Sequence, residues 1–260
     1  MAKNYIINVA TLGARGEGRE HMEDYIWTEN IPENGKNPGI SIFLLADGNG
    51  CHPGCLQAEQ IACPQIIEFV KKCIEVQTDM FTYDPCFFTE LAVMSANKTL
   101  GGFKLGNEEK YGGYGASLTI CITIGQRLHV IHTGNTRLYV IRGGKLSQLT
   151  KDQTRGQEMV DEGKISGDTY YAISESRVIT GGIGFLAEPK IQTFVRKMEP
   201  DDIYVMTTDG IHMTVTGEGI QKLVLESQNC RNAADALITA ASDVLHSEDD
   251  MACIVFHIAG

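Results

Sequence analysis

The chain has 260 residues, 43% of them hydrophobic, and a formal net charge of −11 at pH 7. That length and apolar content suffice for one large domain with its own core. The acidic balance argues against nucleic-acid binding through a broad basic face. No apolar stretch is long enough to cross a bilayer, and residues 1–9 lack the apolar block of a signal peptide. We therefore expect a cytoplasmic protein without nucleic-acid or membrane partners.

Eight cysteines are scattered along the chain, mostly inside apolar runs. Because no secretion signal is recognised, we interpret them as reduced core thiols. Cys51, His52 and Cys55 have the spacing of half a zinc site. A second ligand pair at matching spacing is missing, so this indication is weak.

The first half of the chain alternates between short apolar runs and longer stretches with helical periodicity. The apolar runs predict strands at residues 5–12, 25–27 and 42–46. The periodic stretches predict two core-covering helices, at residues 56–74 and 87–103.

Proline and glycine mark features of these two helices. Pro64 predicts a kink or a restart in the first helix. Gly101 and Gly102 predict the end of the second.

The second half begins as a β region. Alternating residues at 118–124, a return at 128–132 and a further run at 137–141 are separated by glycine turns, which predicts an antiparallel meander. A short helix at 154–163 and a polar stretch at 164–176 predict a mobile flap, so that a flap subdomain covers about residues 154–184.

The C-terminal part again mixes strands and helices. The expected strands are residues 191–195, 203–206 and 253–258, and the expected helices are residues 217–225 and 233–245. Hairpin-joined sheets with separate helical pairs indicate a layered α+β fold and argue against βαβ winding.

Acidic residues stand beside the apolar runs at well-separated positions in the sequence. They are Glu23-Asp24, Asp47-Gly48, Asp209-Gly210 and Asp249-Asp250. Any one alone is more typical of a turn, since Asp-Gly is an ordinary turn dipeptide. Together they predict converging carboxylates, which resist ionising at close range unless cations join them. Oxygen-only ligands, including a carbonyl exposed beside a glycine, favour Mg²⁺ or Mn²⁺ over zinc.

Short motifs follow one another along nearly the whole chain. They are Arg19-x-x-x-Glu23-Asp24, Ala46-Asp47-Gly48-x-Gly50-x-His52, Gly113-x-Gly115-Ala116-Ser117, Gly134-Asn135-Thr136-Arg137, Leu149-Thr150-x-Asp152, Thr208-Asp209-Gly210 and Asp249-Asp250. In this order the motifs resemble those of the metal-dependent serine/threonine protein phosphatases of type 2C, the PPM family, in their bacterial branch. The resemblance implies a single domain.

The resemblance implies a four-layer α-β-β-α sandwich, in which two antiparallel sheets pack face to face between helix pairs. It also implies two Mn²⁺ or Mg²⁺ ions per chain. Asp47 would bridge both ions, while Asp209 and Asp249 would complete the first. Glu23 and the Gly48 carbonyl would hold the second.

The same resemblance implies hydrolysis of phosphoserine and phosphothreonine by water. A water between two cations loses a proton near neutral pH and attacks phosphorus in line. Asp24 would orient metal-bound waters, and Arg19 would clamp the phosphate with its guanidinium fork. The expected partners are phosphorylated proteins and a serine/threonine kinase, and we expect a monomer.

Several positions depart from the family pattern. Asn135 stands where the family has an aspartate, and Gly181 replaces an arginine. Asp250 stands in place of an asparagine, and Ala252 in place of a threonine. The changes at Asn135 and Gly181 leave open a pseudophosphatase that binds phosphoproteins or regulates a kinase without turnover. Hydrolysis of small phosphoesters is a third, weaker hypothesis.

Overall fold

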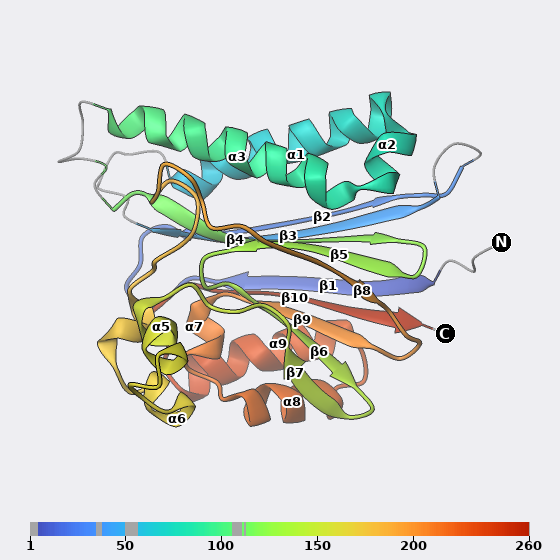
Figure 1. The fold of residues 1–260 in the computed structure, drawn as a ribbon. Helices are drawn as coiled ribbons and strands as arrows, with labels where there is room; N and C mark the ends of the chain where they lie inside the picture. The colour runs from blue at the N-terminus through green and yellow to red at the C-terminus, as the bar shows by residue number, and fades with distance from the viewer. Residues whose placement is uncertain (1–4, 35–37, 50–56, 106–110, 112, 260) are drawn as a thin grey trace.

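Two five-stranded sheets stack face to face, and helices cover the outer side of each (Figure 1). The computed structural model describes residues 5–34, 38–49, 57–105, 111 and 113–259. All strand pairs within the two sheets are antiparallel. The predicted α-β-β-α sandwich is therefore confirmed.

The two sheets draw their strands from different parts of the chain. In spatial order, the first sheet contains β2 (Asp24–Ile31), β3 (Ile40–Asn49), β4 (Gly115–Ile124), β5 (Arg127–Thr133) and β8 (Gln192–Lys197). The second contains β1 (Ile6–Ala14), β10 (Met251–Ala259), β9 (Ile203–Thr207), β6 (Arg137–Arg142) and β7 (Lys145–Gln148).

The predicted continuous meander is wrong at one turn. β5 pairs with β4 and β8, whereas β6 pairs with β7 and β9 in the other sheet. The chain crosses between the sheets near Gly134, where φ is +98° and a Cβ would lie 2.2 Å from the Ser117 hydroxyl oxygen. A glycine in the sequence predicts a turn, but it does not indicate which sheet contains the next strand.

Helices cover each sheet on one side only. On the first sheet lie α1 (Ala58–Val76), α2 (Thr78–Tyr83) and α3 (Pro85–Lys104). On the second lie α8 (Gly217–Leu225) and α9 (Cys230–Thr239), which continues into a π-helical turn at Ala240–Val244. A short helix, α7 (Asp209–His212), follows β9.

Two helix predictions can be compared with the structure. The restart predicted at Pro64 is wrong, because α1 runs on through Pro64 as one helix, while the alternative of a kink stays a prediction. The stop predicted at Gly101 and Gly102 is also wrong, because α3 continues past them to Lys104. A Cβ at either glycine would meet nothing within 4 Å, so these glycines serve no close packing. The contacts that α3 makes with α1 and the sheet outweigh the weak helix propensity of glycine.

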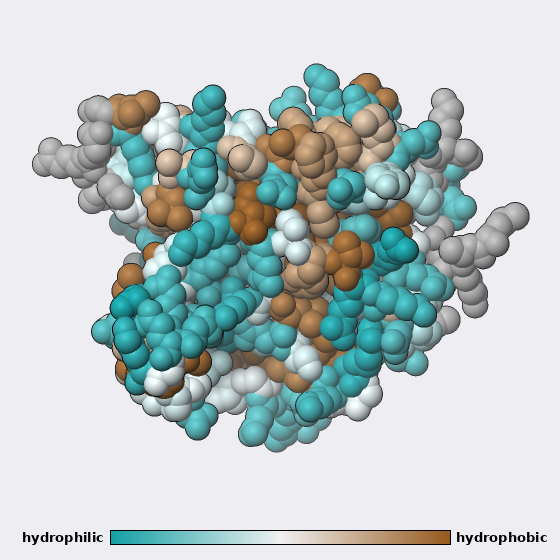
Figure 2. All heavy atoms as spheres, in the orientation of Figure 1, coloured by the Kyte–Doolittle hydropathy of each residue, from teal (hydrophilic) through white to brown (hydrophobic). Residues whose placement is uncertain are grey.

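Residues 155–177 form a compact subregion beside the second sheet. It contains α5 (Arg155–Asp161), α6 (Gly167–Tyr170) and a 3₁₀ turn (Ser174–Arg177). The short helix predicted at its start is confirmed, and the polar stretch predicted to form a mobile flap contains helical turns of its own. In Figure 2 this subregion is mostly hydrophilic, whereas apolar side chains gather over α2 and α3.

Alternation along β3 separates two cores. Ile42 and Leu44 face the helical layer, while Phe43 and Leu45 face the second sheet. The strand extends beyond its predicted end and carries Asp47 in the register of the inner face. The alternation of strand side chains thus directs Asp47 between the sheets and the next residue toward α1.

The six cysteines within the described ranges are free thiols, as the sequence predicts. The candidate half zinc site at Cys51, His52 and Cys55 lies outside the described residues. Where the structure describes the chain, no helix is both long and apolar enough to span a membrane.

Candidate metal and phosphate site

The predicted acidic residues converge at one edge of the sandwich, although they come from both sheets. Asp24 and Asp47 are directly opposite one another on β2 and β3. Asp209 opens α7 immediately after β9, and its carboxylate is within hydrogen-bonding reach of Asp47. Asp249 precedes β10 and acts electrostatically on all three. The predicted convergence of these carboxylates is therefore present in the structure.

The carboxyl groups of Asp24, Asp47 and Asp209 resist ionisation. Burial raises the pKa of Asp47 well above its usual value, and the charges of Asp209, Asp24 and Asp249 raise it further. Burial also raises the pKa of Asp24, although the Thr208 hydroxyl donates a 2.8 Å hydrogen bond to it. The pKa of Asp209 rises to about 6, because burial and Asp249 outweigh its hydrogen bonds. Crowded buried carboxylates of this kind are stabilised by cations.

Arg19 lies among the acids. Its guanidinium donates to Glu23 at 3.2 Å, forms an ion pair with Asp250 at 3.5 Å and also pairs with Asp249. Partial burial acts to lower the pKa of Arg19, but these three acids outweigh it and the net shift is upward. As the side chains lie, no three His, Cys, Asp or Glu residues of the described ranges are arranged to hold a metal ion. The Arg19 guanidinium is the positive charge among Glu23, Asp249 and Asp250.

Asp250 joins the loop after β1 to the start of β10. Its carboxylate accepts hydrogen bonds from the backbone amides of Gly16 at 2.8 Å and Glu23 at 2.7 Å. A Cβ on Gly16 would lie 2.3 Å from the Glu248 carbonyl oxygen, so only glycine permits this approach. Sequence reasoning noted Asp250 as a departure but did not predict this positioning role, which depends on contacts more than 200 residues apart.

Glu59 is an acid of the site that the sequence analysis missed. It occupies the first turn of α1 and is fully buried. Within the described part of the chain, both oxygens of its carboxylate lack a hydrogen-bond partner. Burial raises its pKa to about 8; its own backbone amide and Gln60 oppose the shift, while Glu23 and Asp250 add to it. An acid on the otherwise apolar buried stripe of an amphipathic helix was the signal available in the sequence.

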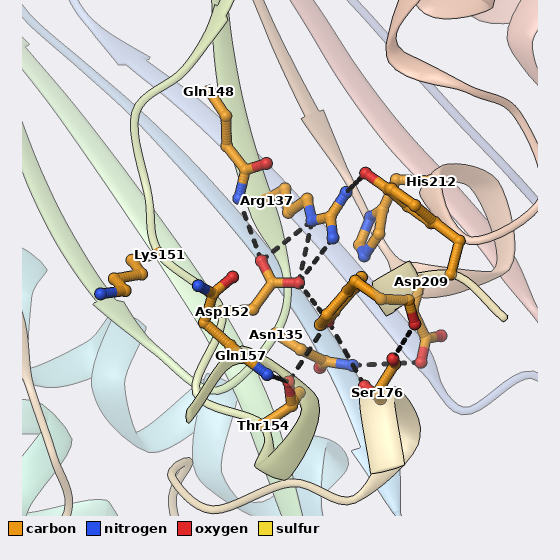
Figure 3. Close-up of polar contacts among 12 residues, drawn as sticks. Asn135, Arg137, Gln148, Lys151, Asp152, Thr154, Gln157, Ser176, Asp209 and His212 are labelled. Atoms are coloured by element: carbon orange, nitrogen blue, oxygen red, sulfur yellow. Dashed lines mark hydrogen bonds and ion pairs between the residues drawn. The ribbon is translucent and has the colours of Figure 1, made fainter. Parts of the chain in front are cut away.

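The amide at Asn135 contacts the acids directly. Its Nδ2 donates to Asp209 at 3.1 Å (Figure 3). Its Oδ1 accepts a 2.7 Å hydrogen bond from the Ser117 hydroxyl. An aspartate here would place a second negative charge beside Asp209, whereas the amide donates to it. The departure at position 135 thus replaces a carboxylate with an internal hydrogen bond.

The glycine at position 181 also has a steric explanation. A Cβ on Gly181 would lie 1.7 Å from Oε1 of Gln153. That oxygen accepts hydrogen bonds from the Gly134 amide at 2.9 Å and the Thr133 hydroxyl at 3.2 Å. Gln153 therefore occupies the space that a side chain at position 181 would need.

A buried polar network attaches the 155–177 subregion to the second sheet (Figure 3). Arg137 on β6 binds Asp152 through Nε and Nη2, and its Nη1 donates to the Tyr171 hydroxyl at 3.1 Å. Tyr170 donates to the same aspartate at 2.7 Å. The 155–177 subregion is thus anchored by charge-assisted hydrogen bonds at its base.

Comparison with known proteins finds similarity to bacterial serine/threonine phosphatases, the family that the sequence motifs resemble. The serine/threonine protein phosphatase PstP of Mycobacterium tuberculosis is 27% identical over 237 residues, which cover 91% of this chain but 42% of PstP. The chain thus spans less than half the length of that relative. Among solved structures, the serine/threonine phosphatase Stp1 of Staphylococcus aureus superposes with a TM-score of 0.84 at 20% identity, covering 100% of this chain and 98% of Stp1.

A second solved structure is the catalytic domain of PstP in complex with 2 manganese ions. It superposes with a TM-score of 0.75 at 24% identity, covering 98% of this chain and 99% of that domain. No protein-family model matches the chain. These similarities confirm the resemblance inferred from the motifs: the chain has the fold of the bacterial serine/threonine phosphatases of the PPM type.

Proposed function

We propose that the chain is a metal-dependent protein phosphatase that hydrolyses phosphoserine and phosphothreonine with two Mn²⁺ or Mg²⁺ ions. The convergence of Asp24, Asp47, Asp209 and Asp249, with raised pKa values at the first three, is the observation that carries this proposal. The donor set is entirely oxygen, which suits a hard divalent cation and argues against zinc. The similarity to phosphatases that bind manganese supports the same reading.

The residues divide between the two cations as the motifs imply. Asp47 is assigned to both, and Asp209 with Asp249 to the first. Glu23 and the Gly48 carbonyl are assigned to the second. Two cations bound there would lower the pKa of a water to near neutral and offset the charge that develops on the phosphate.

Neighbouring groups hold these proposed ligands in place through hydrogen bonds. Asp24 is held by the Thr208 hydroxyl, which leaves its second oxygen for orienting a water. Asn135 and Asp250 fix Asp209 and the Glu23 backbone, respectively. The residues assigned to hydrolysis are therefore supported by hydrogen bonds with Thr208, Asn135 and Asp250, which lie on three different segments of the chain.

Arg19 is assigned to the substrate phosphate. A guanidinium presents paired donors that match two phosphate oxygens. In the structure it pairs with Glu23 and Asp249, which are assigned to different cations. Cations bound by those acids would weaken their hold on the guanidinium, and its donors would then be available to phosphate.

Phosphorylated proteins are the proposed substrates, and a serine/threonine kinase is the proposed partner whose products the enzyme reverses. The names of the relatives support a phosphoprotein substrate. We further propose that residues 1–260 act as one catalytic domain with a flap at about 154–184, as a cytoplasmic monomer.

The test uses the purified chain with a phosphothreonine peptide and Mn²⁺. We expect turnover that EDTA abolishes and that Asp47→Asn lowers by more than about 100-fold, the upper range for losing even a supporting group of a metal ligand. Asp79→Asn on exposed α2 is the matched control and should retain activity.

Other outcomes would identify a different function. Manganese binding without hydrolysis of any phosphopeptide would indicate a pseudophosphatase. Faster hydrolysis of sugar phosphates or nucleotides than of phosphopeptides would indicate a small-molecule phosphatase. Activity that is insensitive to both EDTA and Asp47→Asn would refute the metal mechanism.

A further inference from the structure

We propose that Glu59 is an additional carboxylate of the second cation position, where it binds the ion assigned to Glu23 and the Gly48 carbonyl, directly or through one water. The inference rests on the proposed function and deepens it. Glu59 lies outside every motif that carried the resemblance. Its assignment depends on the burial, orientation and electrostatic surroundings of one side chain.

The first observation is that Glu59 is buried without a partner. Its side chain is 0% exposed, and neither carboxylate oxygen has a hydrogen-bond partner among the described residues. Buried acids in folded proteins are paired, hydrogen-bonded or bound to metals, because an isolated buried carboxylate is strongly unfavourable. Among the described residues, no cation pairs with Glu59, and its own backbone amide and the Gln60 side chain lower its pKa too little to offset burial.

The second observation is where the carboxylate points. A Cβ built on Gly48 would lie 2.1 Å from Glu59 Oε2 and 3.0 Å from the Glu23 backbone oxygen. The Gly48 amide in turn donates to that same Glu23 oxygen at 2.8 Å. The Glu59 carboxylate therefore lies against the two backbone segments that carry the proposed ligands of the second ion. Only glycine at position 48 leaves it this space.

The third observation is the charge around Glu59. The residues whose charges act on it most are Glu23 and Asp250, and both are acidic. Its neighbour one turn along α1 is the buried thiol of Cys63. A cation is the ligand that this negative, oxygen-rich surrounding would bind.

A purely structural role for Glu59 at the start of α1 does not explain its lack of hydrogen-bond partners in the described part of the chain. An acid in the first turn of a helix is favoured by the helix dipole, and Glu59 is in that turn. However, a capping carboxylate accepts well-formed hydrogen bonds from the free backbone amides, and neither oxygen of Glu59 has a partner in good hydrogen-bond geometry among the described residues. The interaction with its own amide leaves the pKa of Glu59 raised. The rest of the buried stripe of α1 is apolar apart from this acid.

The test measures binding of Mn²⁺ alone by titration calorimetry to the whole chain and to Glu59→Gln. We expect the wild type to bind two ions and the variant to lose roughly 10-fold or more in affinity at one of them. Glu68→Gln, on an exposed position of the same helix, is the matched control and should bind like the wild type. Thermal unfolding adds a second readout: without metal the variant should melt higher than the wild type, but Mn²⁺ should raise its Tm less.

Wild-type affinity at both positions in Glu59→Gln would overturn the proposal. A structure of the wild-type chain soaked with Mn²⁺, with the ions located by anomalous scattering, decides the matter even if the variant does not fold. A Glu59 oxygen within about 2.5 Å of manganese, or one bridging water away, supports the assignment; a more distant carboxylate refutes it. If the wild type binds no Mn²⁺ at all, the proposed function fails as well, whereas Mn²⁺-dependent hydrolysis with unchanged binding in Glu59→Gln removes only this inference.

Discussion

Removing the carboxylate of Asp152 should destabilise the protein far more than removing an exposed one. Arg137 and Asp152 are each 3% exposed. Three contacts join the guanidinium to the carboxylate, at 2.9 Å and 3.0 Å from Nε and 2.7 Å from Nη2. Asp152→Ala leaves that guanidinium buried without its counter-charge. The expected loss in the free energy of unfolding is about 3–5 kcal/mol, the usual range for breaking one partner of a buried ion pair.

The chain offers a matched surface pair for comparison. Lys151 and Asp161 approach to 2.7 Å, but their side chains are 57% and 44% exposed. Water and salt screen such a pair, so Asp161→Ala should cost less than about 1 kcal/mol. The two variants remove the same chemical group at similar ion-pair distances and differ in burial, so the difference between their costs isolates the effect of burial.

Urea unfolding followed by Trp27 fluorescence measures the stability lost in both variants. Trp27 is the single tryptophan and packs against the core between the first sheet and helices α1 and α3. A double variant, Arg137→Met with Asp152→Leu, should recover most of the loss, since apolar residues of similar size replace a buried pair at little cost. If Asp152→Ala falls within about 1 kcal/mol of Asp161→Ala, the argument from an unpaired buried charge is wrong. A double variant as unstable as the single one would show that lost packing dominates.

Three further predictions concern the site and its pH dependence. Arg19→Lys should lower kcat/KM for a phosphopeptide about 10-fold, mainly through KM, because it loses one charge-assisted hydrogen bond to phosphate; an unchanged KM would contradict the phosphate clamp. Burial lowers the pKa of His132 to about 4. As the pH falls, His132 is therefore protonated in the unfolded chain before the folded one, and the free energy of unfolding decreases between pH 6.5 and 4, by about 2 kcal/mol at pH 5. Urea unfolding at pH 7 and pH 5 should show that His132→Gln loses less stability over this range than the wild type. Asn135→Asp places a carboxylate beside Asp209 and should lower the free energy of unfolding by about 1 kcal/mol in EDTA at pH 7. Denaturation curves with and without Mn²⁺ should show that the ion restores this stability.

Local sequence was sufficient for most elements of the fold. The strands and helices follow from apolar alternation and helical stripes, because each pattern reports which faces of one short segment are buried. Asp47 and Asp209 were also predictable as candidate site residues, because several acids adjoin strands in one chain, although a single Asp-Gly is an ordinary turn dipeptide. The motifs around them then indicated the sandwich that the structure confirms.

The partners of each segment were decided by the tertiary structure. The crossing at Gly134 depends on which sheet edge is free to accept β6, and no short stretch of sequence contains that information. The continuation of α3 through Gly101 and Gly102 likewise depends on packing against α1.

The same distinction applies to the site. The sequence by itself determined that several acids adjoin strands and that their chemistry suits hard cations. Only the tertiary structure decided that Asp250 bonds to the Glu23 amide, that Asn135 donates to Asp209 and that Glu59 lies buried against Gly48. The reason is physical: burial and hydrogen bonding between distant segments depend on where the folded chain brings them, whereas periodicity and residue type can be read within one segment.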